Sequence, residues 1–409
     1  MRKRLPMICL ICLALLAPAA IHAHRQLPLD TRPLIEAKYG GWAGVLRLWV
    51  CEGWTPGAGS SAAWLNRCVT TFERAHEGVY VQPEFVEPEA LATIGESGIL
   101  PPDLVLFPPG GLVSPEWLAP LEADARPREP IADRGCFDGD CLAVPVAMGG
   151  YLWAYNTGSL AGIPDTWADS PVDPVAPPAE PFRQWGAALL ALCSARYVAD
   201  VERADSTSPS NPSLEMDLGL SPASATESPA PTSVPDAELL DCALPDGFAF
   251  NEEAYRQFIN GAAAAIPVTQ REVRRLEALA DQGRGVDWAL ARTGEGAFTD
   301  QLLFLGVVRT DDAGAKRALC HAFAKHLLDD ACQGELHRSG LFAVTDADSG
   351  YAPGDPLRQM DAVLRVTTLA APNAFDADWP RDVDRIVREF IEGRGTASAL
   401  WRRLARRLR

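Results

Sequence analysis

Aromatic and hydrogen-bonding side chains recur where predicted strands end and where the chain bends. The candidate set is Glu52, Trp54, Phe107, Gly149, Gly150, Tyr151, Thr269, Gln270, Arg271, Phe298 and Asp300. Ligands of open α/β sheets bind outside the carboxyl ends of the strands, which brings such residues together. Rings stack on the C–H faces of sugars, and polar side chains pair with sugar hydroxyls. The set as a whole therefore predicts a sugar-binding site, although a structural role explains each residue taken singly at least as well.

Motifs that carry catalysis are missing from the sequence. It contains no Gly-x-Ser-x-Gly, no His-Glu-x-x-His, no phosphate-binding loop and no dinucleotide-binding glycine fingerprint. His321 and His326 are five residues apart and do not share a helical face, so we do not expect them to bind a metal together. No local pattern of carboxylates marks a glycosidase. We therefore predict a protein that is not an enzyme and uses no cofactor or metal.

The cysteines predict disulfides and an oxidising compartment. Of the 10 cysteines, Cys9 and Cys12 lie in the apolar N-terminal run, and an even number follows. Pairing between sequence neighbours would give Cys51–Cys68, Cys136–Cys141, Cys193–Cys242 and Cys320–Cys332. A continuous helix would hold the two residues of the last pair about 18 Å apart, so the helix must break between them. Asp329 suits the N-cap of a second helix.

Apolar periodicity predicts an α/β fold. Strands are expected at 45–50, 79–86 and 103–107, separated by helices at 61–77 and 87–97. Strands and helices that alternate at this spacing imply right-handed crossovers and a parallel sheet. Further along the chain, the pattern predicts strands at 262–268 and 301–308 and helices at 185–199, 252–259, 270–281, 313–328, 330–338 and 378–409.

The N-terminus and the net charge predict export. Residues 1–23 combine basic residues, an apolar run and small residues, as in a signal peptide or an N-terminal anchor. No clear lipobox surrounds a cysteine, so we expect a periplasmic or extracellular protein, with membrane association through the N-terminus as the alternative. The net charge of −17 excludes a nucleic-acid partner. Residues 205–236, rich in Ser, Thr and Pro, are expected to form a disordered insertion.

Several short stretches are weak signals singly but specific in their order along the chain. They are Phe72–Val81, Pro102–Leu106, Ala143–Asn156 followed by Pro164–Trp167, Phe258–Ala265 and Ala322–Val344. In this order they resemble the extracellular solute-binding proteins of carbohydrate ABC transporters, the group that includes maltose-binding proteins. The resemblance covers about residues 44 to 405 apart from the insertions.

The resemblance implies an α/β, two-lobed periplasmic-binding-protein-like fold with a central cleft and multiple interlobe crossings. Lobe 1 would comprise residues 44–148 plus 303–347, and lobe 2 would comprise residues 149–302 plus 348–409. It further implies that the protein is a monomer, that a small-molecule ligand, a carbohydrate, binds in the cleft, and that the permease subunits of a transporter recognise the closed form.

The same resemblance implies where the chain crosses between the lobes. Crossings are expected at Val144–Asn156, Asp300–Gly306 and Val344–Gly350, with Gly149 and Gly150 permitting unusual dihedrals at the first. The chain departs from the family in its proline-rich segment after Trp167, in its insertion and in the missing lipoprotein cysteine. A sensor or surface interaction module of the same fold is therefore the first alternative, and a secreted carbohydrate-active enzyme is the second.

Overall fold

A computed structural model of the chain describes residues 42–379 and residues 381, 382, 385, 389 and 394, with gaps at 95–99, 113, 122–126, 130, 162–174, 177–248, 251–253, 292–295, 311–313 and 367. The expected leader at 1–23, the insertion at 205–236, the helix at 185–199 and most of the C-terminal helix lie outside the described residues. In the part that is described, no helix has the length and apolar character needed to cross a membrane.

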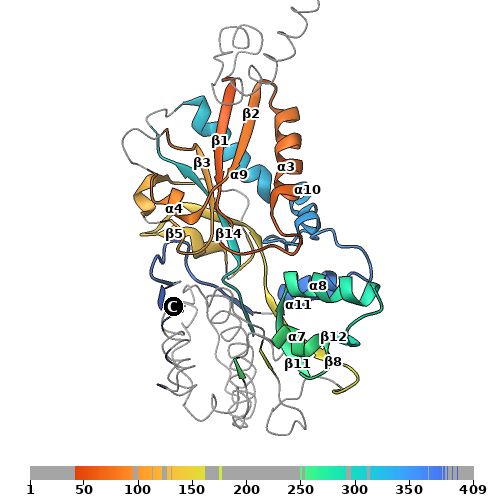
Figure 1. Cartoon of the computed structure of the whole chain (residues 1–409). Coiled ribbons are helices and arrows are strands. Elements are labelled where there is room, and N and C mark those ends of the chain that lie inside the picture. The colour runs from red at the N-terminus through yellow and green to blue at the C-terminus, as the bar shows by residue number, and fades with distance from the viewer. Residues whose placement is uncertain are drawn as a thin grey trace, which may run out of the picture.

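A six-stranded sheet forms the core of the first lobe (Figure 1). Its strands are β1 (Gly44–Val50), β2 (Val79–Phe85), β3 (Leu104–Phe107), β14 (Leu302–Val308), β4 (Leu118–Ala119) and β7 (Ala143–Met148). β1 pairs in parallel with β2 and β3, whereas β14 pairs antiparallel with β3, β4 and β7. The expected parallel arrangement is confirmed for the first three strands, but the complete sheet is mixed because β14 enters it from the other lobe.

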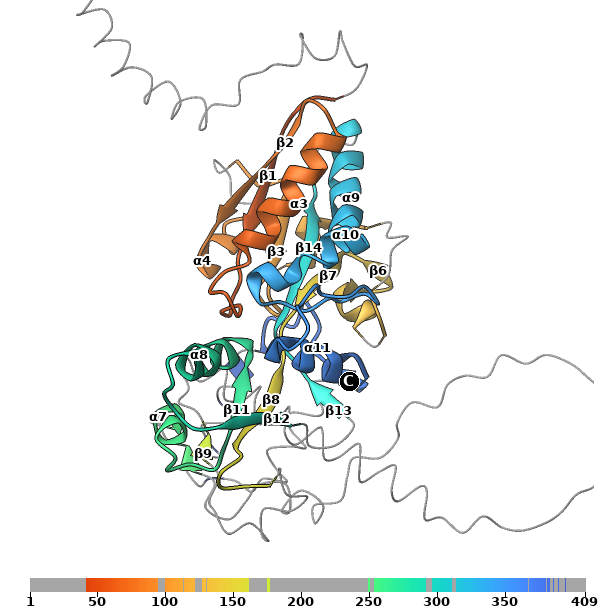
Figure 2. The same ribbon diagram turned by 90° about the vertical axis from the view of Figure 1, so that its right-hand side faces the viewer.

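Helices α3 (Ala62–Ala75) and α9 (Ala315–Leu328) lie side by side against this sheet (Figure 2). The predicted apolar stripe of α3 is buried, with Trp64, Leu65, Cys68, Val69 and Phe72 facing the core. The helix expected at 87–97 is short in the structure, α4 (Pro88–Leu91). After α9 the chain breaks at Asp329, as predicted, and continues as α10 (Asp330–Gln333) and a 3-10 turn, η4 (Leu336–Ser339).

A smaller antiparallel sheet, in the order β11-β8-β12, organises the second lobe (Figure 2). Its strands are β8 (Tyr151–Asn156), β11 (Ala265–Thr269) and β12 (Trp288–Ala291). Helices α7 (Ala254–Ile259), α8 (Gln270–Asp281) and α11 (Pro356–Val366) pack around it. Two small parallel pairs, β9 (Val175–Ala176) with β10 (Ala249–Phe250) and β13 (Gly296–Phe298) with β15 (Thr368–Ala370), complete the described strands of this part.

The chain crosses between the two lobes at three described places. Gly149 and Gly150 connect β7 of the large sheet to β8 of the small one. Residues 299–301 connect β13 to β14. The third connection leads from Phe342, which bridges to Met148 of β7, to α11, which packs against α8.

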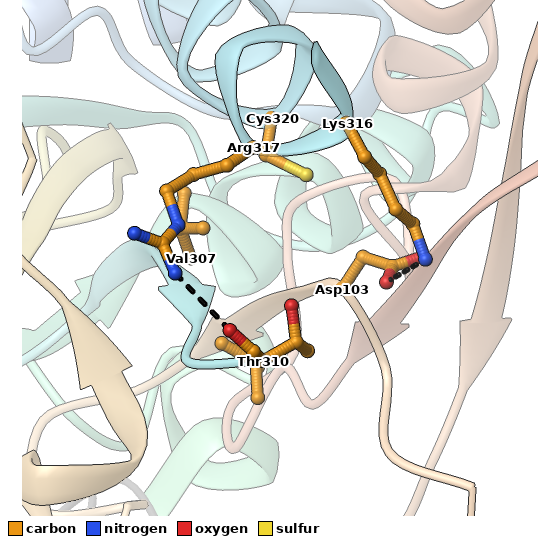
Figure 3. A pocket seen from close by; sticks show the side chains of 7 residues that line it. Asp103, Val307, Thr310, Lys316, Arg317 and Cys320 are labelled. Carbon is orange, nitrogen blue, oxygen red and sulfur yellow. Dashed lines mark hydrogen bonds and ion pairs between the residues drawn. The ribbon is translucent and has the colours of Figure 1, made fainter. Parts of the chain in front are cut away.

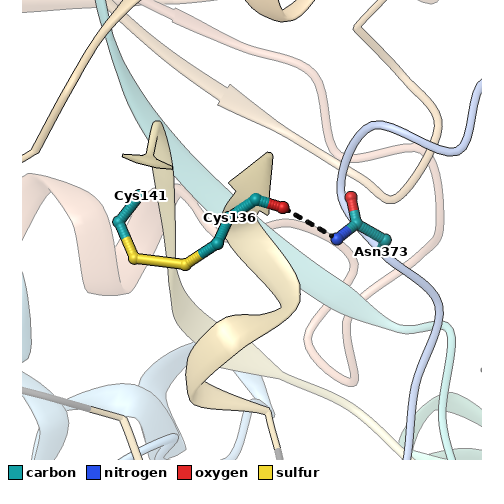
Figure 4. Close-up of a disulfide and its surroundings, with 3 residues drawn as sticks. All are labelled: Cys136, Cys141 and Asn373. Atoms are coloured by element: carbon teal, nitrogen blue, oxygen red, sulfur yellow. Dashed lines mark hydrogen bonds between the residues drawn. A yellow bond between two sulfur atoms is a disulfide. The ribbon is translucent and has the colours of Figure 1, made fainter. Parts of the chain in front are cut away.

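One of the expected disulfides is confirmed. Cys136 and Cys141 are bonded across the hairpin of β5 (Cys136–Phe137) and β6 (Asp140–Cys141), and Asn373 donates its side-chain N–H to the carbonyl oxygen of Cys136 at 3.1 Å (Figure 4). Ala374 also binds this lobe, because its backbone N–H donates to Arg134 O at 2.7 Å. A segment expected within lobe 2 therefore contacts lobe 1.

Two expected disulfides are wrong, because Cys51, Cys68, Cys320 and Cys332 are free and buried thiols. Cys51 follows β1, whereas Cys68 lies roughly 9 Å along α3 from the start of that helix. Cys320 lies eight residues before the end of α9, roughly 12 Å along its axis from the break at Asp329. The pair Cys193–Cys242 lies outside the described residues.

Candidate functional site

The first crossing requires glycine for a reason that the sequence did not indicate. Neither Gly149 nor Gly150 has a positive φ, so the expectation of unusual dihedrals is wrong. A Cβ at Gly149 would instead lie 2.2 Å from both Gln270 Nε2 and Gln301 Oε1, and one at Gly150 would lie 2.5 Å from a methyl carbon of Leu364. Buried side chains approach the backbone too closely here for any larger residue.

A buried network of amides and hydroxyls joins the first two crossings. Gln270 Nε2 donates to Gln301 Oε1 at 2.9 Å, and Gln270 Oε1 accepts the Gly150 backbone N–H at 3.3 Å. Gly149 N–H donates to Gln301 O at 2.7 Å, while Thr299 Oγ1 donates to Gly149 O at 2.9 Å. Gln270, Gln301 and Thr299 are at most 2% exposed. These groups are bound to one another and hold the crossings together.

Tyr151 and Asp300 face each other across the same two crossings. The phenol of Tyr151 donates to Asp300 Oδ1 at 2.7 Å. Burial, and then the neighbouring carboxylate of Asp300, raise the pKa of Tyr151 well above its usual value, so the phenol stays protonated. Asp300 is only partly buried, so one side of this pair remains near solvent. The prediction that these residues lie close together is thus matched by a direct hydrogen bond.

Trp54 and Glu52 approach this region from the first lobe. The indole N–H of Trp54 makes a long hydrogen bond, 3.5 Å, to the carbonyl oxygen of Leu302, just after the second crossing. Trp54 is partly buried and retains exposed ring surface. Glu52 accepts hydrogen bonds from the backbone N–H of Ser61 and the hydroxyl of Ser60, at the start of α3. Trp54 therefore lies at the crossing, whereas the carboxylate of Glu52 has a structural role.

Thr269, Gln270 and Arg271 begin helix α8 at the end of β11. Thr269 Oγ1 accepts the Arg271 N–H at 3.2 Å, and Glu272 reaches back to the Thr269 N–H at 3.1 Å, which forms a capping box. Arg271 is exposed. The strand end predicted from the sequence thus brings Gln270 into the crossing network and leaves Arg271 at its surface.

Phe107 is packed in the interior of lobe 1. Phe107 is fully buried between Phe304 and Phe375, whose ring centroids lie 6.0 and 6.2 Å from its own. Phe298 ends β13, where its backbone is paired with Ala370 of β15, and its side chain lies outside the described set. The interpretation of Phe107 as an accessible sugar-stacking ring is therefore not supported.

The candidate set did not include Thr299, which lies within the predicted stretch 298–300, or Gln301, although both are buried in the crossing network. A signal was present, because two uncharged polar residues flank Asp300 immediately before an apolar strand that leaves no room for unpaired polar groups. Their role became visible only through contacts with Gly149 and Gln270, which are distant in the sequence.

A buried ion pair lies at the third crossing. Arg365 Nε on α11 is 3.2 Å from Asp361 Oδ1, and Arg365 also donates to the carbonyl oxygen of Asp346 at 3.2 Å. Burial raises the pKa of Asp361, which is 4% exposed. Arg128, from lobe 1, donates its backbone N–H to Val344 O at 2.8 Å. This crossing is therefore held by an ion pair within α11 and by a backbone hydrogen bond from lobe 1, in contrast to the uncharged network at the first two.

A small recess of about 210 Å³, open to solvent, occurs on the first lobe instead (Figure 3). It lies beside the Val308 end of β14, opposite to the crossing end at Leu302. Lys316 Nζ is 2.5 Å from Asp103 Oδ1, and Arg317 donates to Thr310 O at 3.1 Å. Lys316 is thus paired with Asp103 and Arg317 with a backbone carbonyl oxygen, so we assign no ligand to the recess. Within the described residues, no three His, Cys, Asp or Glu side chains are arranged to hold a metal ion.

Comparison with known proteins identifies the fold. No family model and no curated protein matches the sequence. Among solved structures, the cyclic alpha-maltosyl-1,6-maltose binding protein of Arthrobacter globiformis aligns with a TM-score of 0.57 at 13% identity, over 90% of this chain and 98% of the other. The maltodextrin binding protein MalE1 of L. casei BL23 gives 0.56 at 14%, with the same coverage.

A family 1 extracellular solute-binding protein of Bifidobacterium longum subsp. infantis gives a TM-score of 0.54 at 12% identity, over 90% of this chain and 99% of its own. The chain therefore has the two-lobed α/β fold of periplasmic binding proteins, as predicted. Several of its structural neighbours are sugar-binding proteins, the group that its sequence resembles.

Proposed function

We propose that this protein is the exported substrate-binding component of a carbohydrate importer. It binds a sugar or oligosaccharide between lobe 1, residues 44–148 plus 303–347, and lobe 2, residues 149–302 plus 348–409, and presents it to a membrane permease. The observation that carries the proposal is the meeting of Trp54 from lobe 1 with the crossing that bears Asp300, which in turn binds Tyr151 of lobe 2. The structural neighbours that bind cyclic alpha-maltosyl-1,6-maltose and maltodextrin support a carbohydrate ligand.

The architecture also accounts for how binding is signalled. The crossings are short and their polar groups are bound internally, so rotation of the lobes is confined to a few backbone positions. A ligand that contacts both lobes favours the closed form through its higher affinity for that form. The proposal assigns no catalytic step to these residues.

The experiment is a calorimetric titration of the exported chain, with its disulfides intact, with maltose, malto-oligosaccharides and chitin oligosaccharides. Trp54→Ala is expected to weaken sugar binding by about 1 to 3 kcal/mol, which is roughly 5- to 150-fold in Kd. Trp117→Ala is the matched control, because Trp117 is also partly buried on lobe 1 but neighbours Arg309 at the far end of β14. Equal effects of the two substitutions would remove Trp54 from the site.

Two results would contradict the broader proposal. One is the absence of binding to every saccharide under conditions in which a known maltodextrin-binding protein binds, which would favour the sensor or interaction module. The other is the release of reducing ends from any of these oligosaccharides, which would favour the carbohydrate-active enzyme. Saccharide binding without turnover is the expected outcome.

A further inference from the structure

Two of the free cysteines meet between helices α3 and α10, although neither was expected to be the partner of the other. Cys68 lies on the buried face of α3 and is 0% exposed, and Cys332 on α10 is 2% exposed. Trp64, one helical turn before Cys68, donates its indole N–H to the carbonyl oxygen of Cys332 at 2.9 Å. The side chains of Cys68 and Cys332 therefore lie in the same contact between α3 and α10.

A histidine side chain completes the cluster. His326 Nε2 lies 3.3 Å from Cys332 Sγ and 3.1 Å from the carbonyl oxygen of Cys68. A carbonyl oxygen only accepts hydrogen bonds, so contact with it favours the tautomer that carries a proton on Nε2. His326 Nδ1 faces Asp329 Oδ2 at 3.5 Å, which favours the imidazolium. His326 Nε2 also lies 3.0 Å from Thr71 Oγ1, so its proton is directed at a group formed by Thr71, the Cys68 carbonyl oxygen and Cys332 Sγ.

This environment distinguishes Cys332 from the other buried thiols. Hydrogen bonds from Cys68 and His326 lower the pKa of Cys332 to about 6. Burial instead raises the pKa of Cys51 to about 11 and that of Cys320 to about 12. A thiolate is the nucleophile in disulfide exchange, so Cys332 is activated in the folded protein whereas Cys51 and Cys320 are inert.

We propose that Cys68 and Cys332 form a disulfide that links α3 to α10 once the chain reaches an oxidising compartment. The oxidant is an exogenous disulfide, such as the oxidised dithiol of an exchange catalyst or oxidised glutathione. The Cys332 thiolate attacks one of its sulfurs and expels the other as a thiolate. The neighbouring Cys332 and burial raise the pKa of Cys68, so this thiol gives its proton to the first released thiolate as its sulfur attacks the Cys332 sulfur and expels the second sulfur of the oxidant. Two electrons pass to the oxidant, and the protons of both cysteines end on its two released thiols.

Both residues are too deeply buried for an oxidant to reach them in the fully packed lobe. The link therefore forms as α10 docks onto α3 during folding, and the docked helices afterwards shield it from reductants. This order explains how a reactive thiolate and a closed environment occur at the same position.

The link would stabilise the rim of lobe 1 that faces the crossings. The loop before α3 carries Trp54 and binds the segment after α10, because Gly57 N–H donates to Gly340 O at 3.3 Å and Ala58 N–H donates to Ser339 O at 3.1 Å. A bond between α3 and α10 fixes both ends of this contact. The rim then moves as one rigid piece with lobe 1.

The first test uses the unaltered chain, exported to an oxidising compartment, alkylated before lysis and digested without reduction. The expected result is a mass-identified peptide pair that joins Cys68 to Cys332 and is lost on reduction, with Cys51 and Cys320 recovered as alkylated thiols after unfolding. Alkylated Cys68 and Cys332 in the purified protein would overturn the proposal. A bond from Cys68 to Cys51, or from Cys332 to Cys320, would overturn it equally.

Because the docked helices shield the link, the second test unfolds each protein in denaturant, refolds it with and without a reductant, and measures the Tm under the same two conditions. Reduction is expected to lower the Tm of the unaltered protein by at least about 4 °C more than that of the Cys68→Ala/Cys332→Ala variant. That variant retains the Cys136–Cys141 bond, so the contribution of this hairpin cancels. The matched control is Cys51→Ala/Cys320→Ala, which also removes two buried thiols and should keep the full shift. Equal shifts in all three proteins would refute the link.

Discussion

Substitution of Gly149 by alanine tests whether the first crossing is fixed by close packing. The added Cβ would lie 2.2 Å from Gln270 Nε2 and 2.2 Å from Gln301 Oε1, so both amides would have to move. Overpacking of this kind costs about 1 to 3 kcal/mol. The movement also separates the 2.9 Å hydrogen bond between the two amides, and a buried polar group left without a partner costs about 1 to 3 kcal/mol more. We expect Gly149→Ala to lose about 2 to 6 kcal/mol of unfolding free energy.

Substitutions of two further glycines serve as comparisons for the stability loss of Gly149→Ala. A Cβ at Gly150 would meet a terminal methyl carbon of Leu364 at 2.5 Å, a flexible group that can rotate away, so Gly150→Ala should lose about 1 to 3 kcal/mol. A Cβ at Gly314 would meet no atom within 4 Å, but this residue is the N-cap of α9, with φ −96° and ψ −139°. Gly314→Ala should therefore lose about 1 kcal/mol, the usual cost of alanine at an N-cap.

The assay is urea-induced unfolding followed by circular dichroism, with the same slope required for each variant so that the free energies can be compared. The reasoning predicts the order Gly149→Ala, Gly150→Ala, Gly314→Ala from the least to the most stable. A Gly149→Ala protein as stable as the Gly314→Ala protein would refute it, because the two buried amides could then not occupy the positions described.

Three other predictions concern the crossings and α8. Tyr151→Phe removes the hydroxyl that donates to Asp300 at 2.7 Å, so the unfolding free energy measured by urea titration should fall by about 1 kcal/mol. An unchanged unfolding free energy would mean that this hydrogen bond does not persist in solution. Thr269→Ala removes the N-cap oxygen that pairs with the first turn of α8 and Glu272, so we expect a loss of about 1 kcal/mol by the same titration, whereas unchanged stability would contradict the capping box. Burial raises the pKa of Asp361 above 3.8, so the contribution of this residue to the unfolding free energy is fully present below pH 3.8 and is lost as the pH rises through the raised pKa. Asp361→Asn should flatten that part of the profile of unfolding free energy against pH. Identical profiles for the two proteins would exclude Asp361 as the cause.

Local signals sufficed for the elements whose stabilising contacts are near in the sequence. The structure begins and ends α8 at Gln270 and Asp281, as predicted, because a Thr269 cap and an apolar stripe are contained in one continuous stretch. The strand expected at 301–308 is present for a similar reason, since its apolar run is bounded by polar residues. Its antiparallel direction in the sheet was not predictable from that stretch, because direction depends on the crossing that precedes it.

The sequence did not predict features that depend on contacts between residues far apart in the chain. The sequence pattern paired each cysteine with the next one along the chain. Because Cys68 lies within α3 and Cys320 within α9, these helices place the two residues too far from Cys51 and Cys332, respectively. Likewise, Phe107 ends its strand as expected, but Phe375, far along the chain, covers its ring. Each error concerns a residue whose partner is more than a hundred positions away or whose helix displaces it from the predicted partner.

These contacts also divide the predicted set into two groups with different roles. Gly149, Gly150 and Gln270 are bound within the crossing network, so a ligand could engage them only by breaking buried hydrogen bonds. Trp54 and Arg271 keep exposed surface on either side of the crossings, and Asp300 is partly exposed between them. A sugar bound by Trp54, Arg271 and Asp300 would draw the lobes together, with the crossing network as the hinge. The proposed site is therefore best tested at Trp54, and the proposed hinge at Gly149.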